Sequence, residues 1–167
     1  MEFQKAKEDF IHSWSTLSNS WGINKTMAQI HALLLLSPKA LSTEEIMHEL
    51  NISRGNANMN IRSLMDWNIV FKSYQPNERK EYFVAEKDLW EVSKQLIQER
   101  KKRELDPLAK MLEQVQLLKN DNSDEVKEFL KITKSVSEFQ SKTDKVLKRL
   151  LKFDKYWFLG TFTKLLK

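Results

Sequence analysis

The sequence contains no cysteine, and it has only three glycines and three prolines among its 167 residues. The absence of cysteine excludes disulfide scaffolds, thiolate metal sites and cysteine nucleophiles, and it is consistent with a reducing compartment. The shortage of glycine and proline, together with abundant Leu, Lys, Glu, Ala, Gln and Met, predicts a mainly helical protein with few tight turns.

Long hydrophobic runs are also missing. The longest apolar run is Ala32 to Leu36, with Ile30 just before it, whereas a membrane-spanning helix needs roughly 20 apolar residues. The first ten residues, MEFQKAKEDF, are charged from the second position and resemble neither a signal peptide nor a transit peptide. We therefore expect a cytoplasmic protein without stable membrane association.

No pattern of residues indicates catalysis. The three histidines, His12, His31 and His48, fall on different predicted helices without the paired spacing that a metal site needs. The sequence has no glycine-rich phosphate loop, no nucleophile elbow and no pair of acids on a pocket-forming strand. We predict that the protein is not an enzyme and binds no metal or cofactor.

The net charge of +5 is unevenly distributed. Residues 142–167 contain eight Lys or Arg side chains against Asp144 and Asp154, so the rest of the chain is close to neutral. Because apolar residues are dispersed through this basic segment, we favour dimerisation or core packing for it. An amphipathic helix on an anionic membrane surface and a direct DNA contact are the alternatives.

Helical signals dominate the first third of the chain. An aromatic and apolar stripe with helical spacing predicts a helix that ends before Gly22 and packs in the core or in a dimer interface. Asn24 is a cap for a central apolar helix, Ser42 and Glu45 form a capping box before a short helix, and Ser53 begins another helix. The stripe consists of Phe3, Ala6, Phe10, Trp14, Leu17 and Trp21.

The remaining chain is expected to contain a hairpin and further helices. Residues 69–75 and 81–85 read as two strands around a polar tip. A helix from Asp88 should end or kink at Asp106-Pro107, and residues 120–124 should form a linker before more helix. We predict three segments: residues 1–22 as a helix for dimerisation or the core, 23–87 as the DNA-binding domain, and 88–167 as a helical dimerisation region.

The order helix, helix, short helix, turn, helix, hairpin is typical of a winged helix-turn-helix, so the fold class is mainly α with a two-stranded β-hairpin wing flanked by dimerisation helices. The second helix of the pair would enter the major groove of DNA. Its side opposite the core positions Ala57, Ile61, Leu64 and Met65 is expected to contact DNA, and so is the wing tip. The predicted DNA-binding residues are Ser53, Arg54, Asn56, Asn58, Met59, Asn60, Arg62 and Ser63 on the helix and Asn77, Arg79 and Lys80 on the wing.

Three asparagines inside this one helix support the interpretation. Asparagine costs about half a kilocalorie per mole relative to alanine in a helix, so Asn56, Asn58 and Asn60 need another justification. Asparagine can pair with adenine through N6 and N7, and arginine can pair with guanine. The alternative is that these asparagines merely solvate an exposed face.

A resemblance to a known family follows from these motifs. The stretches from Ile52 to Asn56, from Trp67 to Val70 and from Asn77 to Phe83 resemble the MarR superfamily of winged helix-turn-helix regulators. The charged stretch from Glu99 to Pro107 and the Trp-rich first helix are most similar to its GbsR-type branch, and the resemblance covers roughly residues 1–115. It implies a homodimeric transcriptional regulator, a repressor by expectation, that binds a pseudo-palindromic double-stranded operator, and in some members a small effector linked to choline or glycine betaine.

Two further interpretations stay open. Trp14, Trp21 and Trp90 could form an aromatic cage for a quaternary ammonium effector, although a core or dimer role accounts for them more simply. A winged-helix adaptor that binds protein and reads no DNA is the alternative function, because a fold alone does not fix a function. Apolar residues on the exposed helix face would favour the adaptor, and only Met59 interrupts the polar set.

Overall fold

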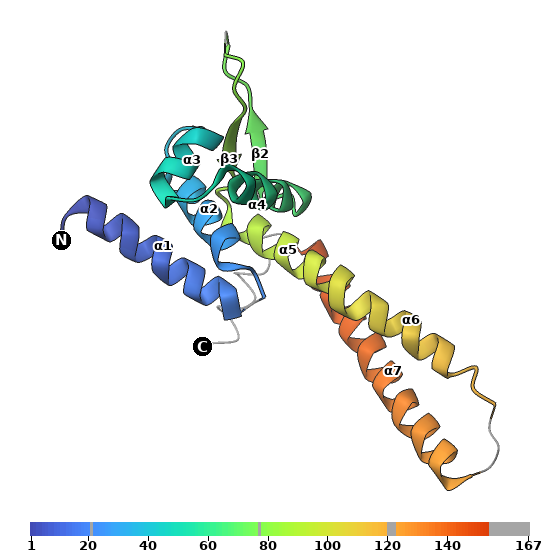
Figure 1. The fold of residues 1–167 in the computed structure, drawn as a ribbon. Coiled ribbons are helices and arrows are strands. Elements are labelled where there is room, and N and C mark those ends of the chain that lie inside the picture. Colours follow the sequence, from blue (N-terminus) through green and yellow to red (C-terminus); the bar gives the residue numbers. More distant parts are fainter. Residues whose placement is uncertain (21, 77, 120–122, 154–167) are drawn as a thin grey trace. The chain divides into compact units, whose positions relative to one another are not determined.

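The computed structural model describes residues 1–20, 22–76, 78–119 and 123–153. It is mainly helical with one small antiparallel sheet (Figure 1), as the sequence predicts. In chain order the elements are α1 (Phe3–Ser20), α2 (Lys25–Leu36), β1 (Leu41–Ser42), α3 (Thr43–Leu50), α4 (Arg54–Asp66), β2 (Val70–Ser73), β3 (Tyr82–Ala85), α5 (Leu89–Arg100), the π-helical turn η1 (Lys101–Leu105), α6 (Asp106–Val115) and α7 (Asp124–Lys152).

The chain divides into two compact units, residues 1–95 and 96–167, with the division inside α5. The predicted division into three segments separated residues 1–22 from the helix-turn-helix. In the structure, α1 contacts α2 within the first unit. The role of residues 1–22 and 88–167 in dimerisation stays a prediction.

Helix α2 forms the centre of the first unit. Ile30, Ala32, Leu33 and Leu34 on this helix are at most 2% exposed, and α2 contacts α1, α3, α4 and β3. A helix that is apolar around most of its circumference must be covered on most sides. The prediction of a central helix between Asn24 and Ser37 is therefore confirmed.

The aromatic stripe of α1 does not form part of the core of this chain. Ile11, Ser15 and Ser18 are its buried residues, whereas Phe3 is 82% exposed and Leu17 is 52% exposed. The small serine side chains allow α1 to approach its neighbour closely, and this leaves the bulky residues outside. Within this chain the described part of the stripe is consequently not core, because Phe3, Phe10 and Leu17 are exposed while Ala6 and Trp14 are half-buried. Its place in a dimer interface stays a prediction.

Capping side chains fix the starts of the helices of the helix-turn-helix. Asn24 accepts a hydrogen bond from Met27 N at 2.8 Å, and Ser53 accepts one from Asn56 N at 3.3 Å. Ser42 and Glu45 form the predicted capping box of α3. Between α3 and α4, Asn51 has a φ of 50°, the left-handed conformation that ends a helix and turns the chain.

The wing contains three strands, so the prediction of a two-stranded hairpin is incomplete. Strands β2 and β3 pair antiparallel, and β1 adds to the other edge of β3, with Leu41 opposite Phe83 and Ser42 opposite Tyr82. Strand β1 has two residues, too few to show an alternating pattern. The hairpin of β2 and β3 projects away from α3 and α4 (Figure 1).

Lys87, which follows β3, closes the C-terminal end of α2. Its ammonium group donates hydrogen bonds to the carbonyl oxygens of Leu34, Leu35 and Ser37 at 2.7 to 2.8 Å. These carbonyls lack partners within the helix, and the cation also complements the negative end of the helix dipole. The bonds join the end of the wing to the central helix.

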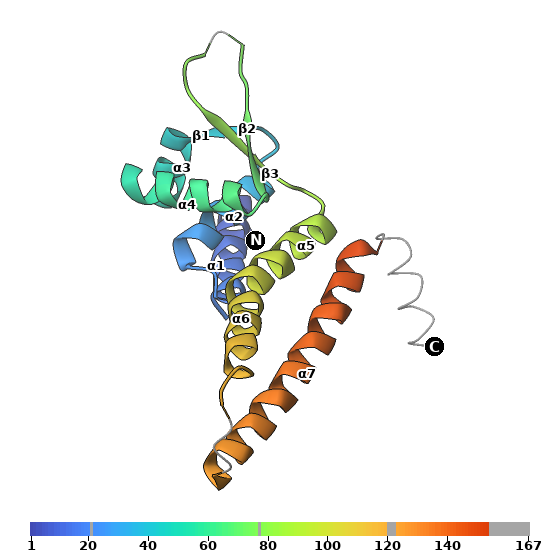
Figure 2. The same cartoon turned by 90° about the vertical axis from the view of Figure 1, so that its right-hand side faces the viewer.

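In the second unit, η1 and α6 pack against the long helix α7 (Figure 2). Pro107 lies in the first turn of α6, directly after the π-helical turn η1, so the regular helix that starts at Leu89 is interrupted just before the Asp106-Pro107 step, as predicted. Lys101 forms ion pairs with Asp106 and Asp144. None of the helices in the described ranges is long and apolar enough to span a membrane.

Buried His31 predicts a loss of stability in acid. Burial and the charge of Lys87 lower the pKa of His31 from 6.5 to about 4. Its Nε2 has no hydrogen-bond partner among the described residues. Because the unfolded chain takes up the proton first as the pH falls below 6.5, the free energy of unfolding should fall between pH 6.5 and about 4, by about 3 kcal/mol in all.

Urea unfolding at pH 7 and pH 4.5 measures this loss. The variant His31→Leu should lose less stability over this interval than the natural protein. The control His12→Leu changes an exposed histidine and should keep the full acid sensitivity. Equal acid sensitivity in all three proteins would contradict the assignment to His31.

Candidate nucleic-acid interface

The second helix of the pair, α4, has a buried side and an open side. Ala57, Ile61 and Leu64 are at most 2% exposed and anchor the helix on the core. On the open side, Met59 is 61% exposed. Ser53, Arg54 and Arg62 are also exposed, and Asn56, Asn58 and Ser63 are half-buried. These seven predicted contact residues are accessible to a partner.

Asn60 is an exception, and the prediction that it lies on the open side is wrong. Its side chain is 1% exposed and faces the start of α2. Asn24 Nδ2 donates a hydrogen bond to Asn60 Oδ1 at 2.8 Å, and Asn60 Nδ2 donates to both Asn56 O and Asn56 Oδ1. A buried amide is tolerated because its polar groups are paired. Asn60 therefore supports the helix and does not contact a partner directly.

Arg54 is exposed but paired. Its guanidinium group donates a hydrogen bond to Glu44 Oε1 on α3 at 2.9 Å. A hydrogen bond to the backbone of Glu44, the bond from Arg54 and the charges of Arg54 and Lys80 all lower the pKa of the Glu44 carboxyl. Exposed pairs of this kind contribute little to stability, so a phosphate group can replace the carboxylate.

Gly55 lies on the open side in the first turn of α4, and nothing in the fold requires a glycine there. A Cβ atom built on Gly55 meets nothing within 4 Å, and the backbone is not in the left-handed region. Glycine costs roughly 0.5 to 1 kcal/mol relative to alanine in a helix. Gly55 was not among the predicted DNA-binding residues, although a glycine inside a predicted helix is a visible signal.

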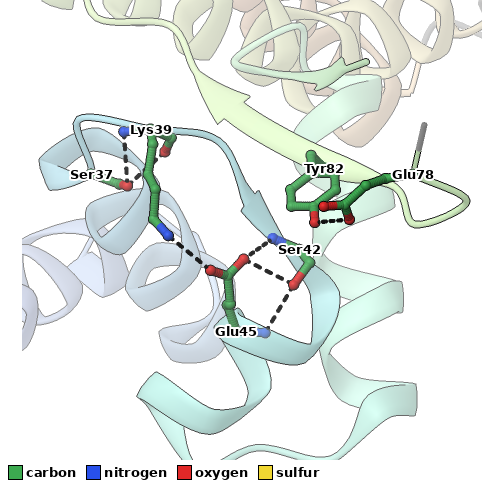
Figure 3. A network of polar contacts seen from close by, with 6 residues as sticks. All are labelled: Ser37, Lys39, Ser42, Glu45, Glu78 and Tyr82. Carbon is green, nitrogen blue, oxygen red and sulfur yellow. Dashed lines mark hydrogen bonds and ion pairs between the residues drawn. The ribbon is translucent and has the colours of Figure 1, made fainter. Parts of the chain in front are cut away.

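Next to α4, the wing presents its predicted basic residues. Arg79 and Lys80 are exposed, while Asn77 lies outside the described residues. Near the tip, Tyr82 OH donates a hydrogen bond to a Glu78 carboxylate oxygen (Figure 3), and this bond is the main reason that the pKa of Tyr82 is raised to about 12. Tyr82 thus remains protonated, and its hydrogen bond to Glu78 connects the start of β3 with the tip of the wing.

The wing and α3 share a residue. Ser42 belongs to β1 and caps α3: its Oγ accepts from Glu45 N at 3.2 Å, and Glu45 Oε2 accepts from Ser42 N at 2.7 Å (Figure 3). Lys39 extends this network with an ion pair to Glu45 at 3.2 Å. The hydrogen bond from the backbone of Ser42 is the main cause of a lowered Glu45 pKa, so the capping carboxylate is ionised at neutral pH.

A second residue that the sequence analysis missed is Tyr74, which follows β2. It is 97% exposed, so it contributes nothing to the core. Its signal in the sequence, an aromatic residue at the end of a predicted strand, is the same as that of a core residue. Only its exposure in the structure distinguishes it from one.

A groove of the first unit is not lined by the two predicted effector residues that the structure describes. That groove has a volume of about 560 Å³ between α1, α2 and α3, and neither Trp14 nor Trp90 lines it. Trp14 stacks on Phe10 with ring centroids 5.7 Å apart and lies 5.9 Å from the His31 ring, Trp90 is half-buried, and Trp21 lies outside the described residues. In the described part of the chain, no three His, Asp or Glu side chains gather as a metal site would need.

Replacing Gly55 should have opposite effects on stability and on DNA binding. Gly55→Ala should raise the free energy of unfolding by about 0.5 to 1 kcal/mol, because the helix gains a better helix former. If α4 contacts bases as predicted, the same methyl group should weaken DNA binding about fivefold or more, since it occupies space at the start of that helix. Urea unfolding and a DNA titration of the same preparation measure both effects.

Gly22→Ala is the matched control. Gly22 is equally open but has a φ of +77°, so alanine there should destabilise the protein and leave the DNA affinity of the folded fraction unchanged. If Gly55→Ala binds DNA as tightly as the natural protein, the open space at Gly55 is not part of the interface.

Comparison with known proteins finds a similar sequence and a similar solved structure. No family model matches the sequence. The chain is 24% identical over 130 residues to the HTH-type transcriptional repressor GbsR of Bacillus subtilis, a match that spans 74% of this chain and 72% of that protein. A crystal structure of a transcriptional regulator superposes with a TM-score of 0.67 at 15% identity, over 95% of this chain and 99% of the other. The chain is thus a distant homologue of GbsR with the fold of a winged helix-turn-helix.

Proposed function

We propose that this distant homologue of GbsR is a homodimeric repressor of transcription that recognises a specific sequence in double-stranded DNA. The observation that carries the proposal is the open side of α4, where Arg62, Met59 and Asn58 stand on a helix held by its other side to a buried core. Both similar proteins are described as regulators of transcription, which supports the same conclusion.

Each accessible group on α4 and the wing has a suitable partner on DNA. In the major groove, Arg62 can donate two hydrogen bonds to guanine, Asn58 can pair with adenine, and Met59 can contact a thymine methyl group. Arg54 can transfer from Glu44 to a phosphate, and Arg79 and Lys80 can reach phosphates or the minor groove. Contacts to bases would set the sequence, and contacts to phosphates would fix the register.

The homodimer is supported by an apolar seam on α7. Five exposed apolar residues recur on this helix at spacings of three, four and seven, which is the heptad pattern of helices that pair with another helix. A seam of this size on a solvated helix is costly unless it is covered. We name as the α7 seam Phe129, Ile132, Val136, Phe139 and Val146, which are 39 to 72% exposed.

We propose that a small effector binds in the groove between α1, α2 and α3. Its volume and its mostly apolar lining suit a small ligand. Glu44 lines this groove and also holds Arg54 of α4. A ligand there would contact the carboxylate that positions an arginine of the DNA-binding helix, and this provides a path for regulation.

Selection of DNA from a genomic library by the purified protein tests the proposed function. We expect the natural protein to enrich a pseudo-palindromic site with half-sites about one helical turn apart. The variant Arg62→Ala with Asn58→Ala should bind that site about 100-fold more weakly, because it loses two base contacts worth roughly 1 to 3 kcal/mol each. Competition with random DNA gives the specificity ratio.

The control removes two lysines from α7, Lys127→Ala with Lys134→Ala, and should bind the selected site about as tightly as the natural protein. If the natural protein enriches no common sequence, specific DNA recognition by α4 is wrong. The protein-binding adaptor would then account better for the exposed Met59.

Charge introduced into the α7 seam should separate the dimer. Val136→Glu with Phe139→Glu places two carboxylates per chain in the apolar contact, so the dimer should weaken about 100-fold or more. Light scattering across a concentration series measures the molar mass. The control Ser141→Glu, at an exposed position off the seam, should remain dimeric; an unchanged mass for the seam variant would place the dimer contact elsewhere.

A further inference from the structure

A run of three asparagine side chains connects the start of α2 with the first turn of α4, and backbone groups at both ends fix the direction of its hydrogen bonds. At one end, Met27 N–H can only donate, so the atom 2.8 Å from it is Asn24 Oδ1. At the other end, the Asn56 carbonyl can only accept, so the atom 2.8 Å from it is Asn60 Nδ2.

These fixed ends allow one arrangement of the atoms between them. Asn24 Nδ2 donates to Asn60 Oδ1 at 2.8 Å, and Asn60 Nδ2 donates a second hydrogen bond to Asn56 Oδ1 at 2.7 Å. Reversing any of the three amides would bring two donors or two acceptors together. The oxygen of the Asn56 amide is therefore directed to Asn60, and its nitrogen remains for other partners.

Burial makes this arrangement persistent. Asn60 is 1% exposed, so water cannot easily replace its partners, and an unpaired amide at that depth would be costly. Asn56 is half-buried, and in the described part of the chain its Nδ2 has no hydrogen-bond partner. The amide nitrogen is thus free to donate to a molecule that approaches α4.

We propose that Asn56 determines specificity by presenting a hydrogen-bond donor to a base edge, and that Asn60 is the positioning residue that fixes this polarity. The inference rests on the proposed function. Residues at the start of the recognition helix are the ones that contact bases, and Asn56 lies in the first turn of α4.

The donor polarity selects among the bases. Guanine, adenine and thymine each present an acceptor in the major groove, at N7 or O6, at N7 and at O4, whereas cytosine presents the N4 amino group. An Asn56 amide that presents only a donor should thus tolerate guanine, adenine or thymine at one operator position and disfavour cytosine. This preference differs from the adenine pairing expected of an unconstrained asparagine, which uses its oxygen as well.

Asn56→Asp tests the inference because it changes one atom of the side chain. One carboxylate oxygen can still accept from Asn60, and the other replaces the outward donor with an acceptor. An acidic residue in the first turn of a helix is also favourable, so the variant should fold. Binding is measured to duplexes that carry each of the four bases at each position of the selected site.

We expect the natural protein to bind about tenfold or more weakly when cytosine occupies one particular position. Asn56→Asp should bind all duplexes more weakly, because of its charge, but should gain affinity for cytosine relative to guanine and thymine at that same position, since cytosine, like adenine, presents an amino donor. The control Asn58→Asp adds the same charge to the same helix outside the asparagine run. It should weaken binding and leave the preference at the Asn56 position unchanged.

Asn60→Ala tests the positioning role. With Asn60 removed, the Asn56 amide can rotate, so the discrimination at its position should fall toward equal binding of all four bases. Discrimination at the position read by Arg62 should persist, which a general loss of structure would not allow. Full discrimination by Asn60→Ala would overturn the role of Asn60.

The outcomes separate the inference from the proposed function. A natural protein that selects a site, together with an Asn56→Asp variant whose base preferences are unchanged at every position, overturns the inference alone. A natural protein that selects no sequence overturns the proposed function and the inference with it. A gain for cytosine relative to guanine and thymine at a single position supports both.

Discussion

The burial of α2 is the constraint on which the first unit depends. This helix is apolar on nearly every side, so it is stable only when α1, α3, α4 and β3 cover it. The partners are short: α3 has eight residues and α4 has 13, lengths that are marginal for isolated helices. They fold because each contributes an apolar stripe to a common core, and their other sides are left open for polar residues.

Polar groups at the ends of these helices fix the orientation of elements that the apolar core packs together. Lys87 closes the end of α2, and Ser42 with Glu45 closes the start of α3. Asn24 serves twice, as the cap of α2 and as the first member of the asparagine run that reaches α4. Helix termini, which carry unpaired backbone groups, thus provide the points at which one element is oriented against the next.

Local signals were sufficient to predict much of this fold from the sequence. Each cap at Asn24, Ser42 and Ser53 involves residues within three positions, and Pro107 marks a helix start by its own chemistry. Asn60 was mispredicted because its partner Asn24 is 36 residues away in sequence, and helical spacing alone places it at the edge of the open side. Strand β1 and the exposed stripe of α1 depend in the same way on contacts that no short pattern contains.

Ser42 has a mechanical consequence. One residue is at once the strand partner of Tyr82 in the wing and the cap of α3, so the wing cannot tilt relative to the helix pair without unwinding the first turn of α3. If the protein binds DNA as proposed, α4 and the wing contact the duplex at a fixed distance from each other. The DNA must then deform to fit this distance. Base pairs that no side chain contacts would therefore influence affinity through how easily they bend and twist.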